Sequence, residues 1–181
     1  MLKNTMASLP PPLATGRYCS LPPHLRAELA AVEPSHDGGM PYFPCRAILE
    51  EGLVLEAVYL APEGPYFRTW GTFPDDDKDK NWIPLELVKH VEDSRLRLPA
   101  RFANELYSTG CVQAGLFAFT VVYSDGSRQR CTAGSAVDFI RHPAGKGPKD
   151  VAEVIPCWER KHAPALSAPP YFWCLYSEVS A

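Results

Sequence analysis

The residues most suited to hold a metal ion are two cysteine and histidine pairs near opposite ends of the chain. Four residues separate Cys19 from His24, and four separate Cys157 from His162. Zinc binds thiolate and imidazole ligands in a tetrahedral arrangement, so these side chains could form one Cys2His2 site. Standard zinc sites pair like ligands at short spacing, and these pairs do not. We therefore expect no bound cofactor and keep a zinc-dependent enzyme as an alternative.

A cysteine-dependent enzyme is a further alternative. Nucleophilic catalysis requires a thiol or hydroxyl beside a histidine that a carboxylate orients. Cys111, Asp138 and His142 supply these groups, although their spacing does not require them to meet. The loop Ala144-Gly145-Lys146-Gly147 lacks the serine or threonine that follows the lysine in phosphate-binding loops, so we expect a turn there. With no complete catalytic signature, we expect a protein without enzymatic activity.

A surface for RNA or single-stranded nucleic acid is the next alternative. Its basic residues would be Arg128, Arg130 and Arg141, and the aromatic residues nearby are Phe117, Phe119 and Tyr123. Such aromatic rings can stack on bases while arginines contact phosphates. The rings could equally fill a core while the arginines face water. Nearby aspartates dilute the positive charge, so we place nucleic-acid binding behind protein binding.

An aromatic and acidic stretch is the preferred candidate for a surface that binds another protein. Its residues are Tyr66, Phe67, Trp70, Asp75, Asp76 and Asp77. Aromatic side chains are enriched at protein interfaces, and clustered acidic side chains attract a basic partner. We expect a non-catalytic protein that acts through protein–protein contacts, for example as an inhibitor or immunity-type factor.

Two predicted β-hairpins position these residues. In 117–134 an apolar run that alternates between two faces leads into the Asp125-Gly126 turn, and a half-polar strand returns. The segment 43–61 repeats this plan around Glu51-Gly52. Each hairpin is followed by an insert and a short segment with valines three apart, which lie in 82–91 and 150–155. The repetition predicts two related β units.

The order of strand, acidic-glycine turn, return strand and later short strand resembles small SH3-like or Sm-like barrels. The expected fold is therefore α+β and β-rich, with two related small barrel or half-barrel units and one connecting helix. Pro99 and Gly110 mark the start and end of that helix. We expect a Pro-rich N-terminal arm with a short helix in 1–40, a first β unit in 41–97, and the connecting helix in 98–110. The second β unit would span 111–181, where 136–140 is another β-like run and 169–178 an aromatic strand buried on both faces or at an interface.

Composition limits the classes of protein that the chain can represent. It has 181 residues, with 18 Lys and Arg against 21 Asp and Glu, which argues against nonspecific affinity for nucleic acid. Nineteen prolines predict long connections, and the six cysteines without a secretory signal predict reduced thiols. No segment approaches the roughly 20 apolar residues needed to cross a bilayer. We expect a soluble, cytoplasmic protein without a membrane partner.

Overall fold

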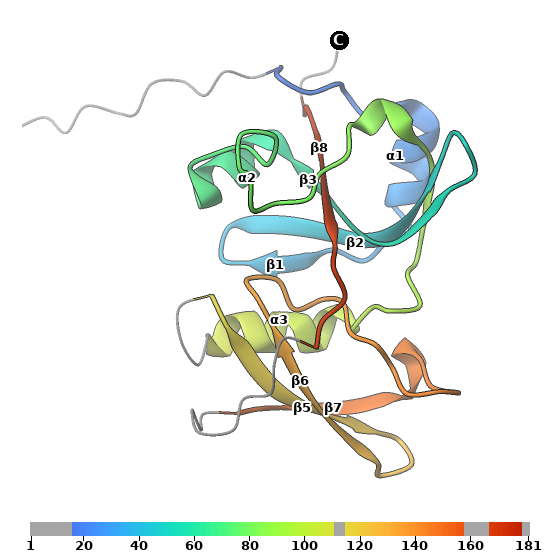
Figure 1. Ribbon diagram of the computed structural model, residues 1–181, viewed down its shortest axis with the longest axis vertical. Coiled ribbons are helices and arrows are strands. Elements are labelled where there is room, and N and C mark those ends of the chain that lie inside the picture. Colours follow the sequence, from blue (N-terminus) through green and yellow to red (C-terminus); the bar gives the residue numbers. More distant parts are fainter. Residues whose placement is uncertain (1–15, 111–114, 158–166, 179–181) are drawn as a thin grey trace, which may run out of the picture.

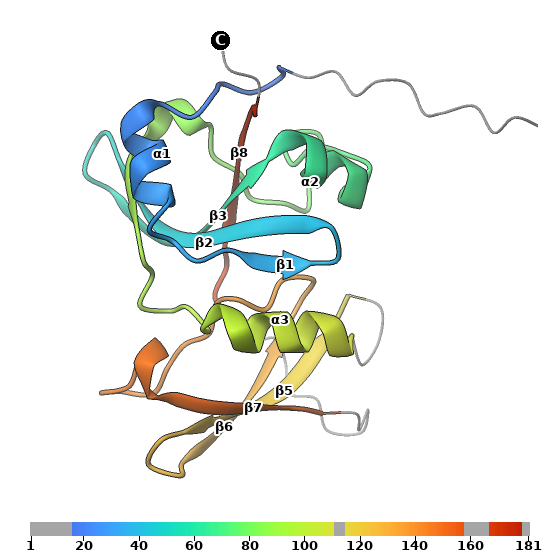
Figure 2. The same ribbon diagram turned by 180° about the vertical axis from the view of Figure 1, so that it is seen from behind.

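The computed structural model describes residues 16–110, 115–157 and 167–178, whose strands form two sheets. The five-stranded sheet contains β1 (Ser35–Asp37), β2 (Met40–Leu49), β3 (Val54–Pro62), β4 (Val88–Glu92) and β8 (Phe172–Tyr176). The three-stranded sheet contains β5 (Phe117–Tyr123), β6 (Arg128–Ala133) and β7 (Val151–Pro156). Helix α3 (Ala100–Thr109) lies between the two sheets (Figures 1 and 2). The strand-rich α+β class is confirmed.

Neither sheet closes into a barrel within the described residues, so the SH3-like or Sm-like units are not confirmed. Both predicted hairpins are present: β2 pairs with β3 and β5 pairs with β6, each in antiparallel orientation. Their turns place Gly52 and Gly126 at φ angles of 79° and 82°, a left-handed conformation that favours glycine. None of the described helices combines the length and apolar character required to span a membrane.

The two hairpins repeat one another at the level of individual strand pairs. Ile48 pairs with Val54 in the first hairpin, as Val122 pairs with Arg128 in the second. On the other side of the leading strand, the short segments predicted from their valines form β4 and β7, with Leu49 opposite Val88 and Tyr123 opposite Val151. Each of these two pairings has a register shift at the same place, immediately before Leu49 and before Tyr123.

The repetition extends to main-chain hydrogen bonds at the hairpin ends. The amide of Glu50 donates to the carbonyl of Leu87 at 3.1 Å, and that of Ser124 donates to Asp150 at 2.8 Å. A 3-10 turn precedes the short strand in both halves, η1 (Leu85–Leu87) before β4 and η2 (Pro148–Asp150) before β7. The strand pairings of the two hairpins therefore correspond position by position.

A helix before each hairpin completes the repeat, and the sequence analysis did not connect the two. Helix α1 (Pro23–Leu29) follows Leu21-Pro22, and α3 follows Leu98-Pro99. The stretches 21–29 (LPPHLRAEL) and 98–106 (LPARFANEL) share a Leu-Pro start and a Glu-Leu end. Proline suits a helix start because the first amides of a helix have no internal acceptor. Helix α1 packs against β4 and α3 packs against β7, as equivalent helices should.

The last strand corrects the expected division of the chain. The sequence predicts the aromatic strand in the second β unit, whereas β8 pairs in parallel with β3 in the sheet of the first hairpin. It is buried on both faces, as predicted, because Trp173 and Cys174 point into different clusters of the core. The run 136–140 is not a strand of either sheet. Its Asp138 carbonyl and Ile140 amide instead bond to Leu98 and Leu96 of the linker before α3.

The five-stranded sheet is covered on both faces. Val58 and Leu60 of β3 face a cluster that includes Leu25 and Leu29 of α1. The alternate residues Tyr59 and Ala61 face a larger cluster shared with α3 and the three-stranded sheet. Because both halves contribute to this larger cluster, the two halves pack as one body through α3.

Candidate binding surface

The four proposed zinc ligands are not brought together within the described residues. The Cys19 thiol bonds to the Glu86 carboxylate at 2.9 Å, and His24 Nε2 lies 3.2 Å from the carbonyl of Lys89. Cys157 instead follows β7 in the other sheet, where its amide donates to the carbonyl of Ala118. His162 lies outside the described residues, among which no group of three potential metal ligands occurs.

Asp138 and His142, proposed for a cysteine-dependent enzyme, each bond to other partners. Asp138 is fully buried and accepts a hydrogen bond of 2.6 Å from the Tyr107 hydroxyl. His142 bonds to the hydroxyl of Tyr123 and to the carbonyl of Arg97, both at 3.1 Å. Burial raises the pKa of Asp138 and lowers that of His142, so neither shift reflects a pairing of the two. Cys111 lies outside the described residues.

The described thiols are free, and three are buried in strands, as expected for reduced packed cysteines. Burial raises the pKa of Cys131 to about 11 and that of Cys45 to about 12, so both stay protonated near neutral pH. The loop 144–147 is the expected turn, since the Lys146 amide donates to the carbonyl of Pro143 at 3.0 Å.

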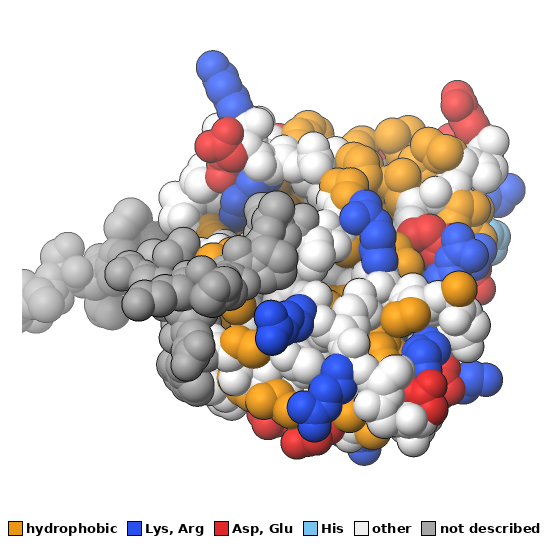
Figure 3. All heavy atoms as spheres, turned by 60° about the horizontal axis from the view of Figure 1, so that its bottom comes forward, with side chains coloured by type: hydrophobic (Ala, Val, Ile, Leu, Met, Phe, Trp, Pro, Cys, Tyr) orange, Lys and Arg blue, Asp and Glu red, His pale blue; other side chains and the backbone are white. Residues whose placement is uncertain are grey.

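The residues proposed to bind nucleic acid separate into two environments. Arg128, Arg130 and Arg141 are exposed. The aromatic rings that were to stack on bases belong to the core instead, and they are those of Phe117, Phe119 and Tyr123. On the face shown in Figure 3, basic side chains lie scattered among acidic and apolar ones. Nucleic-acid binding by the three arginines stays a prediction, without the proposed stacking platform.

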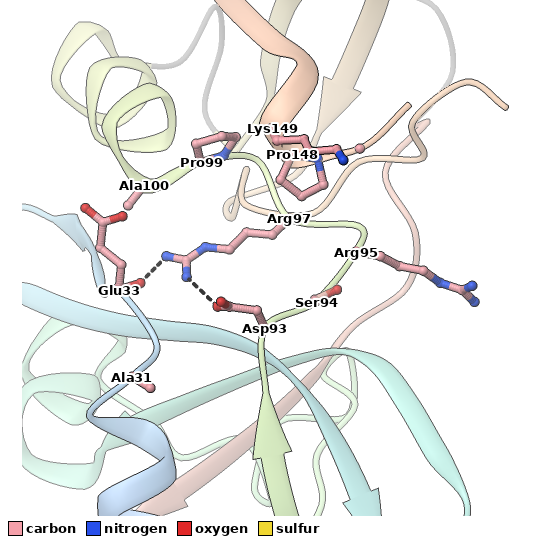
Figure 4. Close-up of a pocket in the computed structure, with 11 residues that line it drawn as sticks. Ala31, Glu33, Asp93, Ser94, Arg95, Arg97, Pro99, Ala100, Pro148 and Lys149 are labelled. Carbon is pink, nitrogen blue, oxygen red and sulfur yellow. Dashed lines mark hydrogen bonds and ion pairs between the residues drawn. The ribbon is translucent and has the colours of Figure 1, made fainter. Parts of the chain in front are cut away.

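A cavity of about 680 Å³ lies where three connecting segments of the two halves meet (Figure 4). Arg97 crosses it and is 5% exposed. Its guanidinium donates to the main-chain carbonyl of Glu33 and lies 3.7 Å from the carboxylate of Asp93. These contacts tie the α1–β1 connection to the linker before α3, which is a structural use of the arginine.

The aromatic stretch proposed to bind a partner forms a helix that the sequence analysis did not predict. Helix α2 (Glu63–Trp70) begins after Pro62 and ends at Gly71, whose φ of 71° terminates it in the left-handed conformation. Tyr66 faces the core and is fully buried, so it is not part of the exposed surface of α2. Phe67 and Trp70 are half-buried, and the aspartate loop follows α2.

The N-terminal arm occupies the surface beside α2. The buried carboxylate of Glu63 accepts hydrogen bonds from three consecutive main-chain amides, those of Gly16 at 2.7 Å, Arg17 at 3.1 Å and Tyr18 at 3.3 Å. A carboxylate that gathers successive amides holds an extended or turning backbone whatever its side chains are. We call Glu63, Phe73, Asp75 and Asp76 the arm-binding surface.

Side-chain contacts add selectivity to this main-chain recognition. The Arg17 guanidinium lies 2.6 Å from the Asp75 carboxylate and 2.9 Å from that of Asp76. It also lies 4.6 Å from the centre of the Phe73 ring, within the range of a cation–π contact. Tyr18 packs edge-on against Phe73 and donates a hydrogen bond to Asp75. The surface thus contacts both an arginine and the aromatic residue that follows it.

Electrostatics at this surface follow from these contacts. Partial burial alone would raise the pKa of Asp75, but hydrogen bonds from Tyr18 and Arg17 outweigh it and lower that pKa. Hydrogen bonds to Asp76 and Asp75 raise the pKa of the Arg17 guanidinium. Asp77 is not part of the arm-binding surface. Its carboxylate instead accepts a hydrogen bond from the amide of Asp79 in a local turn.

The comparisons with known proteins add no functional information. The chain was compared with family models, with curated proteins and with solved structures, and none of the three comparisons gives a match.

Proposed function

We propose that the protein is a non-catalytic binding protein that holds a basic, aromatic segment of a partner protein on the arm-binding surface. One observation carries this proposal: residues 16–18 of the chain itself are bound there through main chain, guanidinium and ring. A partner segment with an arginine and a following aromatic residue presents the same groups. It would compete with the arm for the same site.

Two kinds of contact support recognition of a protein segment. The buried Glu63 binds three main-chain amides, which every peptide segment without proline at these positions can supply. Asp75 and Asp76 bind an arginine from two directions over the face of Phe73. Arginine suits this site better than lysine because its planar guanidinium can bond to carboxylates and stack at once.

The arm acts as an internal competitor for the surface. A tethered segment has an effective concentration on the order of millimolar, so a free peptide of similar intrinsic affinity occupies the surface only in part. Weakening the arm should therefore increase the affinity of the surface for a free segment.

A labelled, N-acetylated peptide with the sequence of residues 16–20 tests the proposal. We expect it to bind the Arg17→Ala chain at least about tenfold more tightly than the unaltered chain, because the cis competitor is weakened. Adding Asp75→Ala and Asp76→Ala should abolish that gain, and added salt should weaken binding. Fluorescence anisotropy measures all of these affinities.

Arg95→Ala is the matched control. Arg95 is a largely exposed arginine that pairs with Glu56, away from the arm-binding surface, so its loss should leave peptide affinity unchanged. The proposal fails if the folded Arg17→Ala chain does not bind the peptide at millimolar concentration, or binds it equally well without Asp75 and Asp76.

Acid should release the arm from the unaltered chain. The pKa of Asp75 in the folded protein lies below its ordinary value of about 3.9. The contribution of Asp75 is therefore complete above that value and is lost as the pH falls through the lowered pKa. Nuclear magnetic resonance (NMR) signals of Tyr18 should move over this range, and an Asp75→Asn chain should not show that transition.

A further inference from the structure

Three aromatic rings surround the ammonium group of Lys80 on the inner side of α2. Lys80 Nζ lies 3.4 Å from the centre of the Trp70 ring, 5.5 Å from that of Tyr66 and 5.9 Å from that of Trp173. The rings contact one another, with centres 6.2 Å apart for Tyr66 and Trp70 and 4.9 Å apart for Tyr66 and Trp173. We call Tyr66, Trp70 and Trp173 the aromatic cage.

The cage presents ring faces to the Lys80 ammonium, and the one acceptor it contains, the Tyr66 hydroxyl, does not hydrogen-bond to it. Among the described residues, Lys80 Nζ has no hydrogen-bond acceptor and no carboxylate within ion-pair distance. Burial also lowers the pKa of Lys80, and the distant charge of Asp77 opposes this only in part. The partly buried ammonium therefore loses part of its hydration, and no acceptor among the described residues replaces it.

Two polar atoms of the cage are also unpaired. The hydroxyl of Tyr66 and the indole N–H of Trp70 are buried and have no hydrogen-bond partner among the described residues. Tyr66 itself is fully buried. The core could have been filled at lower cost by phenylalanine or leucine, because a buried polar atom without a partner destabilises the fold. A water molecule in the site can pair with both atoms. A quaternary ammonium has no lone pair to accept their hydrogens, so the case for the ligand depends on the ring faces.

A cavity of about 370 Å³ opens beside the cage. Lys80, Tyr171 and Trp173 line it, together with Asp79, Asn81 and the prolines at 169 and 170. It leaves room for the part of a ligand that follows its cationic group. The carboxylate of Asp79, an exposed residue, gives the wall of this cavity a negative charge that favours a cation.

We propose that the aromatic cage is a binding site for a quaternary or methylated ammonium group, and that Lys80 occupies it in the unliganded protein. A trimethylated ammonium keeps the positive charge that ring faces attract, and it has no N–H donors that need acceptors. The cage therefore favours it over a primary ammonium. This site is distinct from the arm-binding surface and does not depend on its function.

Full-length variants at Lys80 test this site. Lys80→Ala should empty the cage, whereas Lys80→Met should fill it with an uncharged chain of similar length. Titration with tetramethylammonium should shift the indole N–H signals of Trp70 and Trp173 in an NMR spectrum of the Lys80→Ala chain. We expect binding about tenfold tighter than in the unaltered chain, and little binding by Lys80→Met.

Controls separate cage binding from general effects. Trp82, which is 40% exposed and not part of the cage, reports whether the shifts are specific. Ammonium chloride should bind at least about tenfold more weakly than tetramethylammonium, because it carries unpaired donors. Lys80→Ser is a second way to empty the cage if Lys80→Ala does not fold. The inference is overturned if a folded, emptied variant shows no Trp70 or Trp173 shift at about 100 mM ligand, or shifts equally with ammonium.

The source of the group is then determined by two further ligands. Choline represents small quaternary ammonium compounds, and a peptide containing trimethyllysine represents a modified protein segment. Tighter binding of the peptide than of choline, with no binding of the unmodified peptide, supports a methylated protein as ligand. The opposite order supports a small molecule, and failure of both overturns the site. Because these assays leave Arg17, Asp75 and Asp76 unchanged, their outcome is independent of the proposed function.

Discussion

The two halves of the molecule have the same hydrogen-bonded frame but different surfaces. In each half a helix that begins after Leu-Pro packs on a strand that pairs with the leading strand of a hairpin. Between the hairpin and that strand, the first half carries α2, the aspartate loop and the cage lysine. The second half carries 134–147, which holds the buried Asp138 and contributes no equivalent surface.

The difference between the two surfaces shows which features the shared arrangement of helix and strands requires. Main-chain hydrogen bonds define the hairpin ends, so exposed side chains there are free to differ. The first half has exposed Leu53, Val54 and Leu87 at its end. The positions paired in the same way in the second half are Ser127, Arg128 and Asp150. Candidate binding features therefore lie in the parts that are not repeated.

Truncation of the equivalent core leucines should have the largest effect on stability. It tests whether α1 and α3 pack in equivalent ways. Leu29 and Leu106 end the two Leu-Pro helical stretches and are 4% and 2% exposed. We expect Leu29→Ala and Leu106→Ala each to lower the free energy of unfolding by about 2–5 kcal/mol, measured by urea denaturation. Leu87→Ala, at an exposed position, is the control. A silent change at one of the two leucines would show that the helices are not equivalent in packing.

Alanine at the two turn glycines should destabilise the fold less than the leucine truncations do. It compares the two hairpin turns directly. An added Cβ at Gly52 or Gly126 meets nothing within 4 Å, so only the left-handed backbone conformation opposes it. We expect a loss of about 1 kcal/mol in the free energy of unfolding for each change. Gly39, where a Cβ also meets nothing and φ is not left-handed, is the control and should change little. Unequal losses at the two turns would indicate different turn geometries in solution.

Exchange of the exposed end residues should have the smallest effect on stability. Leu53, Val54 and Leu87 are 58%, 37% and 44% exposed, so little burial is lost when they change. We expect Leu53→Ser, Val54→Arg and Leu87→Asp each to alter the free energy of unfolding by less than about 0.5 kcal/mol. Chemical denaturation of the single variants checks this. A loss above about 2 kcal/mol would mean that these side chains support the frame after all.

Local sequence patterns predicted the elements but not all of their partners. Alternation and turn glycines identified both hairpins, and Pro99 with Gly110 identified α3. They missed α2, because proline at its start and aromatic residues along it do not form a strong helical pattern. They also assigned β8 to the wrong sheet, since burial on both faces says nothing about which strand lies beside it.

At the candidate surfaces, too, the sequence predicted single segments but not the distant residues that contact them. The sequence marked Phe67, Trp70 and the aspartates as a group that could bind. It could not show that Arg17 lies on Asp75, or that Trp173 closes a cage with Trp70, because these partners are far apart along the chain.

The sequence by itself determined the strands of the two hairpins and their turns, because these depend on side-chain periodicity and on the backbone freedom of neighbouring residues. Only the tertiary structure decided that β8 joins the first sheet, that the arm covers the acidic loop and that three rings enclose Lys80. Such contacts arise when distant segments compete to bury the same apolar surface and satisfy the same polar groups. No local sequence pattern determines which of these segments makes the contact.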